Sequence, residues 1–148
     1  MKFKLAVAAM ALGFAALIQA QTSPARPVMT VYKSPTCGCC SNWIAHMKEN
    51  GFEVKSLDVD DIDVVKKGNG VPAAVSSCHT AVVGGYVVEG HVPASAVKRM
   101  LSEKPAIAGI AVPGMPAGSP GMEVPGRQDA YSVVSFDKAG KQSLYEKH

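Results

Sequence analysis

Residues 28–50 read VMTVYKSPTCGCCSNWIAHMKEN, and this stretch decides the fold. Its first six residues, Val28 to Lys33, have the β-branched and aromatic composition of a strand. After a break at Ser34-Pro35-Thr36, the segment from Cys37 to Asn50 places its apolar residues at helical spacing. Gly51 follows as a helix-terminating residue. We therefore expect a strand that leads into a helix whose first turn carries three cysteines.

The segments that follow have the order of a thioredoxin-like domain. Alternating apolar and polar residues at 52–59 predict a second strand, and residues 60–67 predict a short helical turn. Strand-forming residues flank Gly84-Gly85, which is a hairpin signal, and a helix is expected from Pro93 to Glu103. This order, with a CxxC motif opening the first helix, predicts an α/β thioredoxin-like fold with a mixed sheet flanked by helices.

The C-terminal part of the chain has a different character. Residues 105–126 hold five prolines, five glycines and two methionines, so we expect a methionine-containing loop with neither helix nor strand. Two strand-like runs, Tyr131–Phe136 and Gln142–Tyr145, flank a turn and predict a closing β-hairpin. Residues 28–148 are thus expected to form a single domain.

The N-terminus is typical of a secretory signal peptide. Two lysines precede an uncharged apolar run of 14 residues, 5–18, and a small-residue cleavage point follows at Ala20. The run is shorter than the roughly 20 residues needed to span a bilayer, so an uncleaved anchor is the weaker interpretation. We predict a signal peptide at 1–20, a flexible lead-in at 21–27 and a periplasmic location.

The charge balance gives no support for a nucleic-acid partner. The net charge of +3 includes Lys2 and Lys4, so the 128 residues left after cleavage carry +1. No basic stripe remains in that sequence. We expect no nucleic-acid partner and no membrane span after cleavage, and the remaining length is enough for one core.

All four cysteines follow the leader, at Cys37, Cys39, Cys40 and Cys78. Two structural disulfides are the default in an exported protein. The spacing disfavours them, because adjacent Cys39 and Cys40 are poorly placed to bridge each other and three cysteines crowd into four residues. Cys37 and Cys40 share one face at the helix N-terminus, where the helix dipole stabilises thiolate. Thiolates exchange disulfides and bind metals, so the CxxC pair supports both functions.

Cys39 favours the metal-binding function, because a thiol–disulfide enzyme needs two sulfurs whereas a soft-metal cluster benefits from a third. The hairpin register brings in a fourth sulfur. If Val83 pairs with Tyr86, the numbers of each facing pair add to 169, which places Cys78 opposite His91. The hairpin would thereby return one thiol and one imidazole to the cysteine-bearing helix.

Other candidate ligands carry less support. Met115 and Met122 offer thioether sulfurs suited to Cu(I), with simple packing as the alternative. His79 is the weaker histidine, because strand alternation directs it away from Cys78. His46 lies on the first helix and is expected at the surface.

Four motifs stand in order along the chain: SPTCGCCSNW at 34–43, SCHT at 77–80, YVVEGHVP at 86–93 and VPGMPAGSPGME at 112–123. Together they resemble the CopG-like family of periplasmic copper proteins, long catalogued as a domain of unknown function. The resemblance covers about residues 29–136. It implies a thioredoxin-like fold, a multinuclear Cu(I) site built on the four cysteines, and a role in copper resistance.

The leading hypothesis is a periplasmic protein of copper resistance that holds copper, as Cu(I), for sequestration, transfer or redox cycling. Its predicted metal ligands are Cys37, Cys39, Cys40, Cys78, His91, Met115 and Met122. The expected partners are copper ions and other periplasmic copper-handling proteins. Whether the chain is an enzyme stays open, with a copper oxidoreductase as one option. The alternatives are a thiol–disulfide oxidoreductase that uses Cys37 and Cys40, and a zinc site of three cysteines and a histidine.

Overall fold

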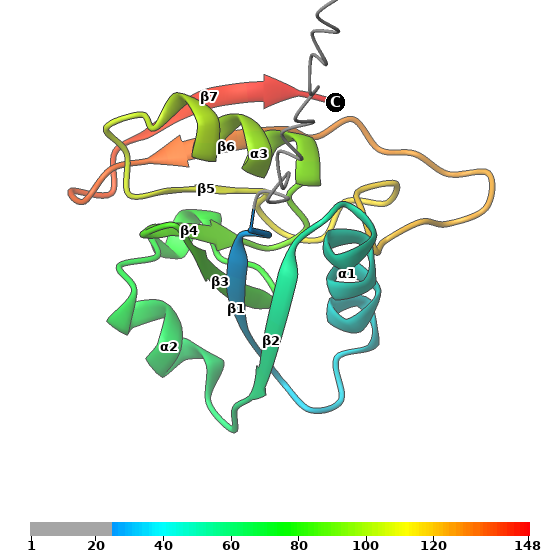
Figure 1. The fold of residues 1–148 in the computed structure, drawn as a ribbon. Helices are drawn as coiled ribbons and strands as arrows, with labels where there is room; N and C mark the ends of the chain where they lie inside the picture. Colours follow the sequence, from blue (N-terminus) through cyan, green and yellow to red (C-terminus); the bar gives the residue numbers. More distant parts are fainter. Residues whose placement is uncertain (1–24) are drawn as a thin grey trace, which may run out of the picture.

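A computed structural model describes residues 25–148 as a single seven-stranded sheet with helices packed on it (Figure 1). The helices are α1 (Gly38–Glu49), α2 (Ile62–Gly68), α3 (Ala94–Glu103) and the short 3-10 helix η1 (Ala73–Val75). The strands are β1 (Val28–Lys33), β2 (Glu53–Asp58), β3 (His79–Val83), β4 (Tyr86–Glu89), β5 (Gly109–Ala111), β6 (Ser132–Phe136) and β7 (Gln142–Lys147). The predicted signal peptide, 1–20, and most of the lead-in lie outside the described residues.

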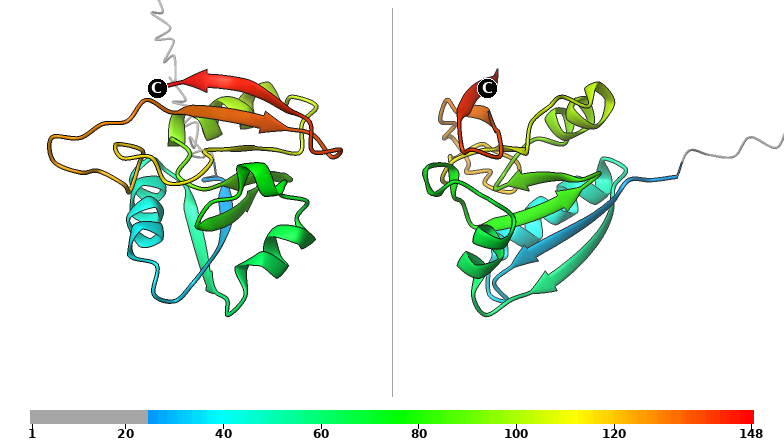
Figure 2. Two further views of the ribbon diagram at one scale, coloured as in Figure 1. Left: turned by 180° about the vertical axis from the view of Figure 1, so that it is seen from behind. Right: turned by 90° about the vertical axis from the view of Figure 1, so that its left-hand side faces the viewer.

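The sheet is mixed, with the strand order β2-β1-β3-β4-β5-β6-β7. β1 and β2 are parallel because α1 crosses between them, and β4 and β5 are also parallel. The remaining neighbours are antiparallel. The β6–β7 hairpin and α3 form one end of the molecule, and β1, β2, α1 and α2 form the other (Figures 1 and 2). The predicted thioredoxin-like α/β architecture is confirmed.

The main core lies between the sheet and the two longer helices. Its buried helical side chains are Trp43, Ile44 and Met47 from α1 and Ala94, Ala96, Val97 and Met100 from α3. The α1 residues follow the helical spacing read in the sequence. Trp43 is fully buried, and its indole N–H donates to the carbonyl oxygen of Val92 at 2.8 Å. This bond satisfies the one polar atom of the ring and fastens α1 to the segment before α3.

The two predicted hairpins are confirmed. β3 and β4 pair across Gly84-Gly85, where both glycines have positive φ values of 56° and 82°. Such values suit a two-residue hairpin turn and are readily adopted by glycine. β6 and β7 form the closing hairpin, with a bulge at Val133/Val134.

The expectation that residues 105–126 contain no strand is wrong for three residues. Gly109–Ala111 form β5, which pairs with both β4 and β6 and is buried throughout. A side chain on Gly109 would place its Cβ 2.2 Å from the carbonyl oxygen of Val87, so the close pairing requires glycine. Three residues are too few to show a strand period, which is why composition predicted a loop.

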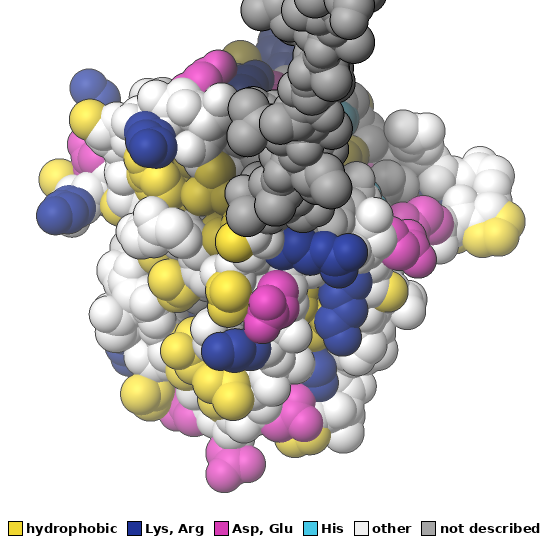
Figure 3. All heavy atoms as spheres, viewed as in Figure 1, with side chains coloured by type: hydrophobic (Ala, Val, Ile, Leu, Met, Phe, Trp, Pro, Cys, Tyr) yellow, Lys and Arg dark blue, Asp and Glu magenta, His cyan; other side chains and the backbone are white. Residues whose placement is uncertain are grey.

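The exterior mixes charges of both signs with apolar side chains. On the face that carries β1 and β2, basic and acidic groups lie among apolar ones (Figure 3). Leu57 of β2 and Val64 of α2 are 47 % and 64 % exposed. Within residues 25–148, no helix has the length and apolar character needed to cross a membrane.

His46 is half-buried, so the expectation that it lies at the surface is wrong. Its Nε2 accepts a hydrogen bond from the backbone N–H of Ala94, the first residue of α3, at 3.1 Å. The capping residue Pro93 makes no side-chain bond to this helix, so His46 satisfies an amide that α3 would otherwise leave free. Burial lowers the pKa of His46, which keeps the ring neutral and Nε2 available as an acceptor.

This contact predicts a pH-dependent contribution to stability. The unfolded chain takes up a proton near the ordinary histidine pKa of 6.5, whereas the folded ring resists protonation. The contribution is therefore complete above pH 6.5 and is lost as the pH falls towards the lowered folded value. We expect His46→Leu, which removes the acceptor, to reduce the free energy of unfolding by about 1 kcal/mol at pH 7.5 and by less at pH 5. Urea denaturation of both proteins at the two pH values measures this, and an unchanged difference would contradict it.

Candidate metal centre

The first turn of α1 gathers three of the four cysteines. Cys37 is the N-cap residue, and its backbone N–H donates to the carbonyl oxygen of Ser34 at 3.2 Å, which closes the turn after β1. A disulfide joins Cys37 to Cys40, whose Cα atoms are 5.4 Å apart. Cys39 and Cys78 are free thiols. The structure thus contains one disulfide rather than the two of the default interpretation.

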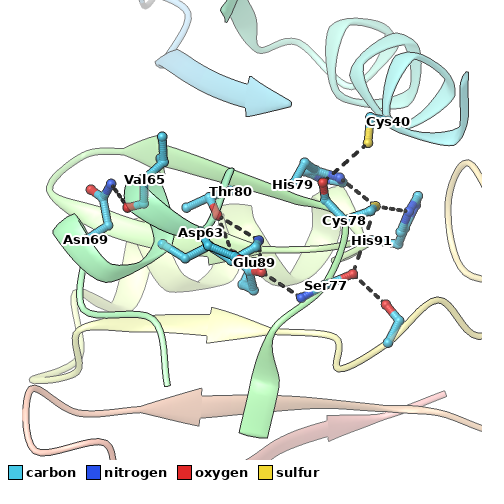
Figure 4. Close-up of polar contacts among 12 residues, drawn as sticks. Cys40, Asp63, Val65, Asn69, Ser77, Cys78, His79, Thr80, Glu89 and His91 are labelled. Atoms are coloured by element: carbon cyan, nitrogen blue, oxygen red, sulfur yellow. Dashed lines mark hydrogen bonds and ion pairs between the residues drawn. The ribbon is translucent and has the colours of Figure 1, made fainter. Parts of the chain in front are cut away.

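The hairpin delivers Cys78 to His91 as the register predicts. The β3–β4 ladder follows that register as far as the pair Thr80 and Glu89. Beyond the end of the ladder, the Cys78 Sγ lies 3.0 Å from the His91 Nε2 (Figure 4). Two residues that are 13 positions apart in the sequence therefore share one end of the sheet.

The four cysteine sulfurs converge at this end of the sheet. All four Sγ atoms lie within 4.8 Å of one another. The Cys39 Sγ is 3.4 Å from that of Cys37, and the Cys40 Sγ is 3.8 Å from the carbonyl oxygen of Cys78. Cys40 is fully buried and the other three are partly exposed, so the cluster opens to solvent on one side.

His91 presents a fixed nitrogen to the sulfurs. It is fully buried, and its Nδ1 lies 2.8 Å from the carbonyl oxygen of Pro120. A carbonyl accepts only, so Nδ1 carries the proton and Nε2 keeps its lone pair towards Cys78. An imidazole oriented through its second nitrogen in this way is typical of a metal ligand.

His79 also belongs to the site, contrary to the expectation that it faces away from Cys78. Its Nδ1 is 3.3 Å from the Cys78 Sγ, and its ring lies 4.4 Å from that of Trp43 and 5.1 Å from that of His91. The strand begins at His79, so Cys78 is outside the regular alternation on which the expectation rested. The His79 Nε2 is buried and has no hydrogen-bond partner among the described residues. Cys78, His79 and His91 form a second group of potential ligands within 4.8 Å.

Burial governs protonation at the site. It raises the pKa of Cys78 to about 12, and the neighbouring Cys39 adds to the rise. Burial also lowers the pKa of His91 and takes that of His79 well below its usual value, with help from His91 and Lys66. At neutral pH, Cys78 is therefore a thiol and both imidazoles are neutral. A metal ion must displace the thiol proton but finds the histidine nitrogens already free.

The two predicted methionine ligands lie on the segment that covers α1. Met115 is 52 % exposed and Met122 is half-buried. Gly121, beside Met122, packs so tightly on α1 that a Cβ there would lie 2.7 Å from the Trp43 backbone nitrogen and 2.9 Å from the Cys39 carbonyl oxygen. The segment is thus seated over the cysteine turn, with one methionine directed largely to solvent.

A buried polar group beneath Cys78 was missed at the level of sequence. Glu89 is fully buried, and Lys66 pairs with it. A usable signal was present, because Glu89 ends the otherwise apolar strand Tyr86–Glu89. Lys66 gave no signal, since it belongs to a charged segment that resembles a solvated turn.

The donor atoms fit a soft metal ion. Thiolate and imidazole are ligands that select soft and borderline metals over hard ones. The neutral state of both histidines agrees with such a site, and the His79 Nδ1 faces the Cys78 Sγ at 3.3 Å. Binding by all four sulfurs requires reduction of the Cys37–Cys40 bond, because only thiolates serve as strong metal ligands.

Comparison with known proteins agrees with the motifs. A family model described as a protein of unknown function, DUF411, matches residues 75–122. A solved structure named copper resistance protein copG, form 2, is 44 % identical, with 83 % of this chain and 98 % of that chain covered and a TM-score of 0.80. The chain belongs to the CopG family. Form 1 of copG is 45 % identical, covers 82 % of this chain and 96 % of its own, and has a TM-score of 0.78.

Membership of the CopG family confirms the resemblance seen in the four sequence motifs. The match to the copG structures extends over most of the described residues, whereas the DUF411 model covers only the segment from the 3-10 helix to Met122. No match was found among curated proteins.

Proposed function

We propose that this protein binds copper as Cu(I) in the periplasm and serves copper resistance. The observation that carries the proposal is the convergence of four sulfurs from two distant segments within 4.8 Å. Soft thiolate ligands select Cu(I), zinc and iron–sulfur clusters over hard ions. Among these, the relatives named for copper resistance support copper.

The proposed ligands divide into an inner and an outer set. The inner set is Cys37, Cys39, Cys40, Cys78 and His91, with His79 added on the evidence of its contact with Cys78. Cys78 belongs to both groups of potential ligands, so it is placed to bridge more than one ion. Met115 and Met122 form the outer set, and the exposure of Met115 suits capture or release of copper at the surface.

The proposed role is to hold copper for sequestration, for transfer to other periplasmic copper-handling proteins, or for a change of oxidation state. The methionine-containing segment that packs on α1 at Gly121 favours retention of bound copper. The partial exposure of Cys37, Cys39 and Cys78 leaves a path by which copper can be exchanged. A copper oxidoreductase activity would use the same sulfurs.

The proposal is tested by metal analysis of protein in two thiol states. Protein reduced without oxygen, loaded with Cu(I) and desalted is expected to retain several copper ions per chain. Protein whose Cys37–Cys40 bond is kept oxidised is expected to retain far fewer, since that bond occupies two sulfurs. Equal zinc retention in a parallel loading would favour the zinc site instead. Absence of copper from the reduced protein would overturn the proposal.

A second candidate function is thiol–disulfide exchange, and the Cys37–Cys40 disulfide at a helix N-terminus favours it. Under this function, Cys37 as thiolate attacks a substrate disulfide and Cys40 resolves the mixed disulfide. A disulfide-exchange assay on metal-free protein separates the two functions. Activity that persists in a Cys39→Ser/Cys78→Ser variant would favour the enzyme, because neither residue takes part in that cycle.

Copper binding is expected to release protons and to strengthen as the pH rises. The Cys78 thiol, with its pKa raised to about 12, must lose a proton to bind, whereas the neutral histidines contribute none above their lowered pKa values. For each proton that binding releases, the affinity for copper rises about tenfold when the pH increases by one unit. Chelator competition between pH 6 and 8 measures the slope. A flat profile would show that Cys78 binds no metal or binds as the thiol.

The proposed location has its own test. Expression of the full chain in a Gram-negative host should place it in the periplasmic fraction with Gln21 as the first residue. N-terminal mass analysis of that fraction decides this, and an intact Met1 in the cytoplasm would contradict the signal peptide.

A further inference from the structure

A buried ion pair lies beneath the loop that carries Cys78. Glu89 of β4 is fully buried, and its Oε1 accepts from the Lys66 Nζ of α2 at 2.5 Å. The Thr80 hydroxyl accepts from the same Nζ at 3.1 Å and donates to the Glu89 Oε2 at 2.7 Å. The ammonium and the carboxylate are thereby held by α2, β3 and β4 together.

The carboxylate also reaches the chain next to Cys78. The backbone N–H of Ser77 donates to the Glu89 Oε1 at 2.7 Å, and Figure 4 shows Ser77 and Thr80 on either side of Glu89. The Ser77 hydroxyl donates to the carbonyl oxygen of Gly114 at 2.5 Å. Ser77 therefore joins the ion pair to the cysteine on one side and to the methionine-containing segment on the other.

The packing leaves little freedom at this point. Gly90 follows Glu89, and a Cβ there would lie 2.5 Å from the Ser77 side chain. The absent side chain of Gly90 makes room for Ser77 to approach the carboxylate. Because the carboxylate holds the Ser77 amide, the backbone that leads into Cys78 is fixed in position. The Cys78 sulfur accordingly lies 3.0 Å from the His91 Nε2.

Apolar residues of similar size often stabilise a core as well as a buried ion pair does, because they avoid the desolvation cost. The pair at Glu89 and Lys66 supplies something that apolar residues cannot. That contribution is the acceptor offered to the Ser77 amide.

We propose that Glu89 and Lys66 are positioning residues for Cys78. Glu89 fixes the Ser77 amide, and Lys66 balances the buried charge, so that the Cys78 sulfur is held beside His91 and the α1 cysteines before any metal arrives. The proposal rests on copper binding at this site for its consequence, but the geometry it describes belongs to the metal-free protein.

Two double variants separate the acceptor from the charges. Glu89→Gln/Lys66→Met removes both charges and keeps an amide oxygen for Ser77, whereas Glu89→Leu/Lys66→Met removes the charges and the acceptor. Both avoid an unpaired buried charge. We expect the Gln variant to keep close to the wild-type Cu(I) affinity and the Leu variant to lose about 10- to 100-fold, as is usual when support for a ligand is removed.

A second readout needs no copper. In reduced, metal-free protein, the rate of Cys78 alkylation by iodoacetamide, mapped by mass spectrometry, should rise several-fold in the Leu variant and stay near wild type in the Gln variant. Glu89→Asp provides a further test if the Leu variant fails to fold, because it keeps the charge but withdraws the carboxylate from Ser77, and should also speed alkylation. Glu146→Gln, at the ion pair with Arg99, is the control.

Wild-type alkylation rates in the Leu and Asp variants would overturn the positioning role, as would equal losses in the Gln and Leu variants. Failure of the wild-type protein to bind copper would overturn the proposed function alone, since alkylation still reports on the position of Cys78.

Discussion

Cys78→Ser is expected to remove most of the copper that the reduced protein binds. Cys78 belongs to both groups of potential ligands, with its Sγ 3.0 Å from the His91 Nε2 and 3.3 Å from the His79 Nδ1. Serine offers a hard oxygen that does not suit Cu(I). Loss of supporting residues alone weakens metal sites by about 10- to 100-fold, so loss of a shared ligand should exceed that range. Copper per chain after anaerobic loading, with chelator competition, gives the measurement.

The serine variant should remain folded, because the change is nearly isosteric and Cys78 is only partly buried. Its free energy of unfolding is expected within about 1 kcal/mol of wild type. Ser41→Ala is the matched control, since it changes an exposed hydroxyl on α1 one residue from Cys40. Full copper retention in Cys78→Ser would refute a shared cluster, even if the other cysteines proved essential.

Gly121→Ala is expected to lower both the free energy of unfolding and the copper affinity. Gly121 has φ 84°, and a Cβ would meet two backbone atoms of α1, the Trp43 nitrogen and the Cys39 carbonyl oxygen, at 2.7 and 2.9 Å. Backbone atoms of a helix cannot move aside individually, so the segment must lift. Overpacking of this kind costs about 1–3 kcal/mol, and the left-handed backbone adds about 1–2 kcal/mol for alanine. Urea denaturation measures the sum.

The effect on the site follows from the neighbouring residue. Pro120 supplies the carbonyl oxygen that orients His91, so lifting Gly121 should free that imidazole and weaken copper binding by about tenfold. Gly126→Ala is the matched control, because Gly126 also has a positive φ, 74°, but has open space around it. The control should show only the backbone part of the destabilisation. Equal losses in the two variants would show that contact with α1 is unimportant.

Two kinds of feature could be predicted from the sequence. One is a helix or strand whose apolar residues recur at regular spacing, and the other is a strand pairing that can be counted outward from a hairpin turn. The helical spacing of Trp43, Ile44 and Met47 correctly predicted the buried face of α1. Counting residue pairs outward from the Gly84-Gly85 turn correctly predicted that Cys78 lies opposite His91. Both rest on interactions within a few residues or across one hairpin, which a single sequence displays.

The features that could not be predicted depend on contacts between distant segments. β5 is a strand only because β4 and β6 pair with it on either side, and its three residues carry no period. His79 joins the site because the strand starts one residue later than regular alternation assumes. Lys66 is buried by a partner 23 residues away, so nothing around it in the sequence marks it as a core residue.

The contact between Trp43 and His79 gives the site an optical signal. The chain has one tryptophan, and its ring lies 4.4 Å from that of His79, which in turn contacts Cys78. All of the indole emission therefore comes from one fluorophore, which contacts His79, a candidate ligand. Binding of copper at the cluster should change this emission, so binding can be followed by the protein's own fluorescence without a label.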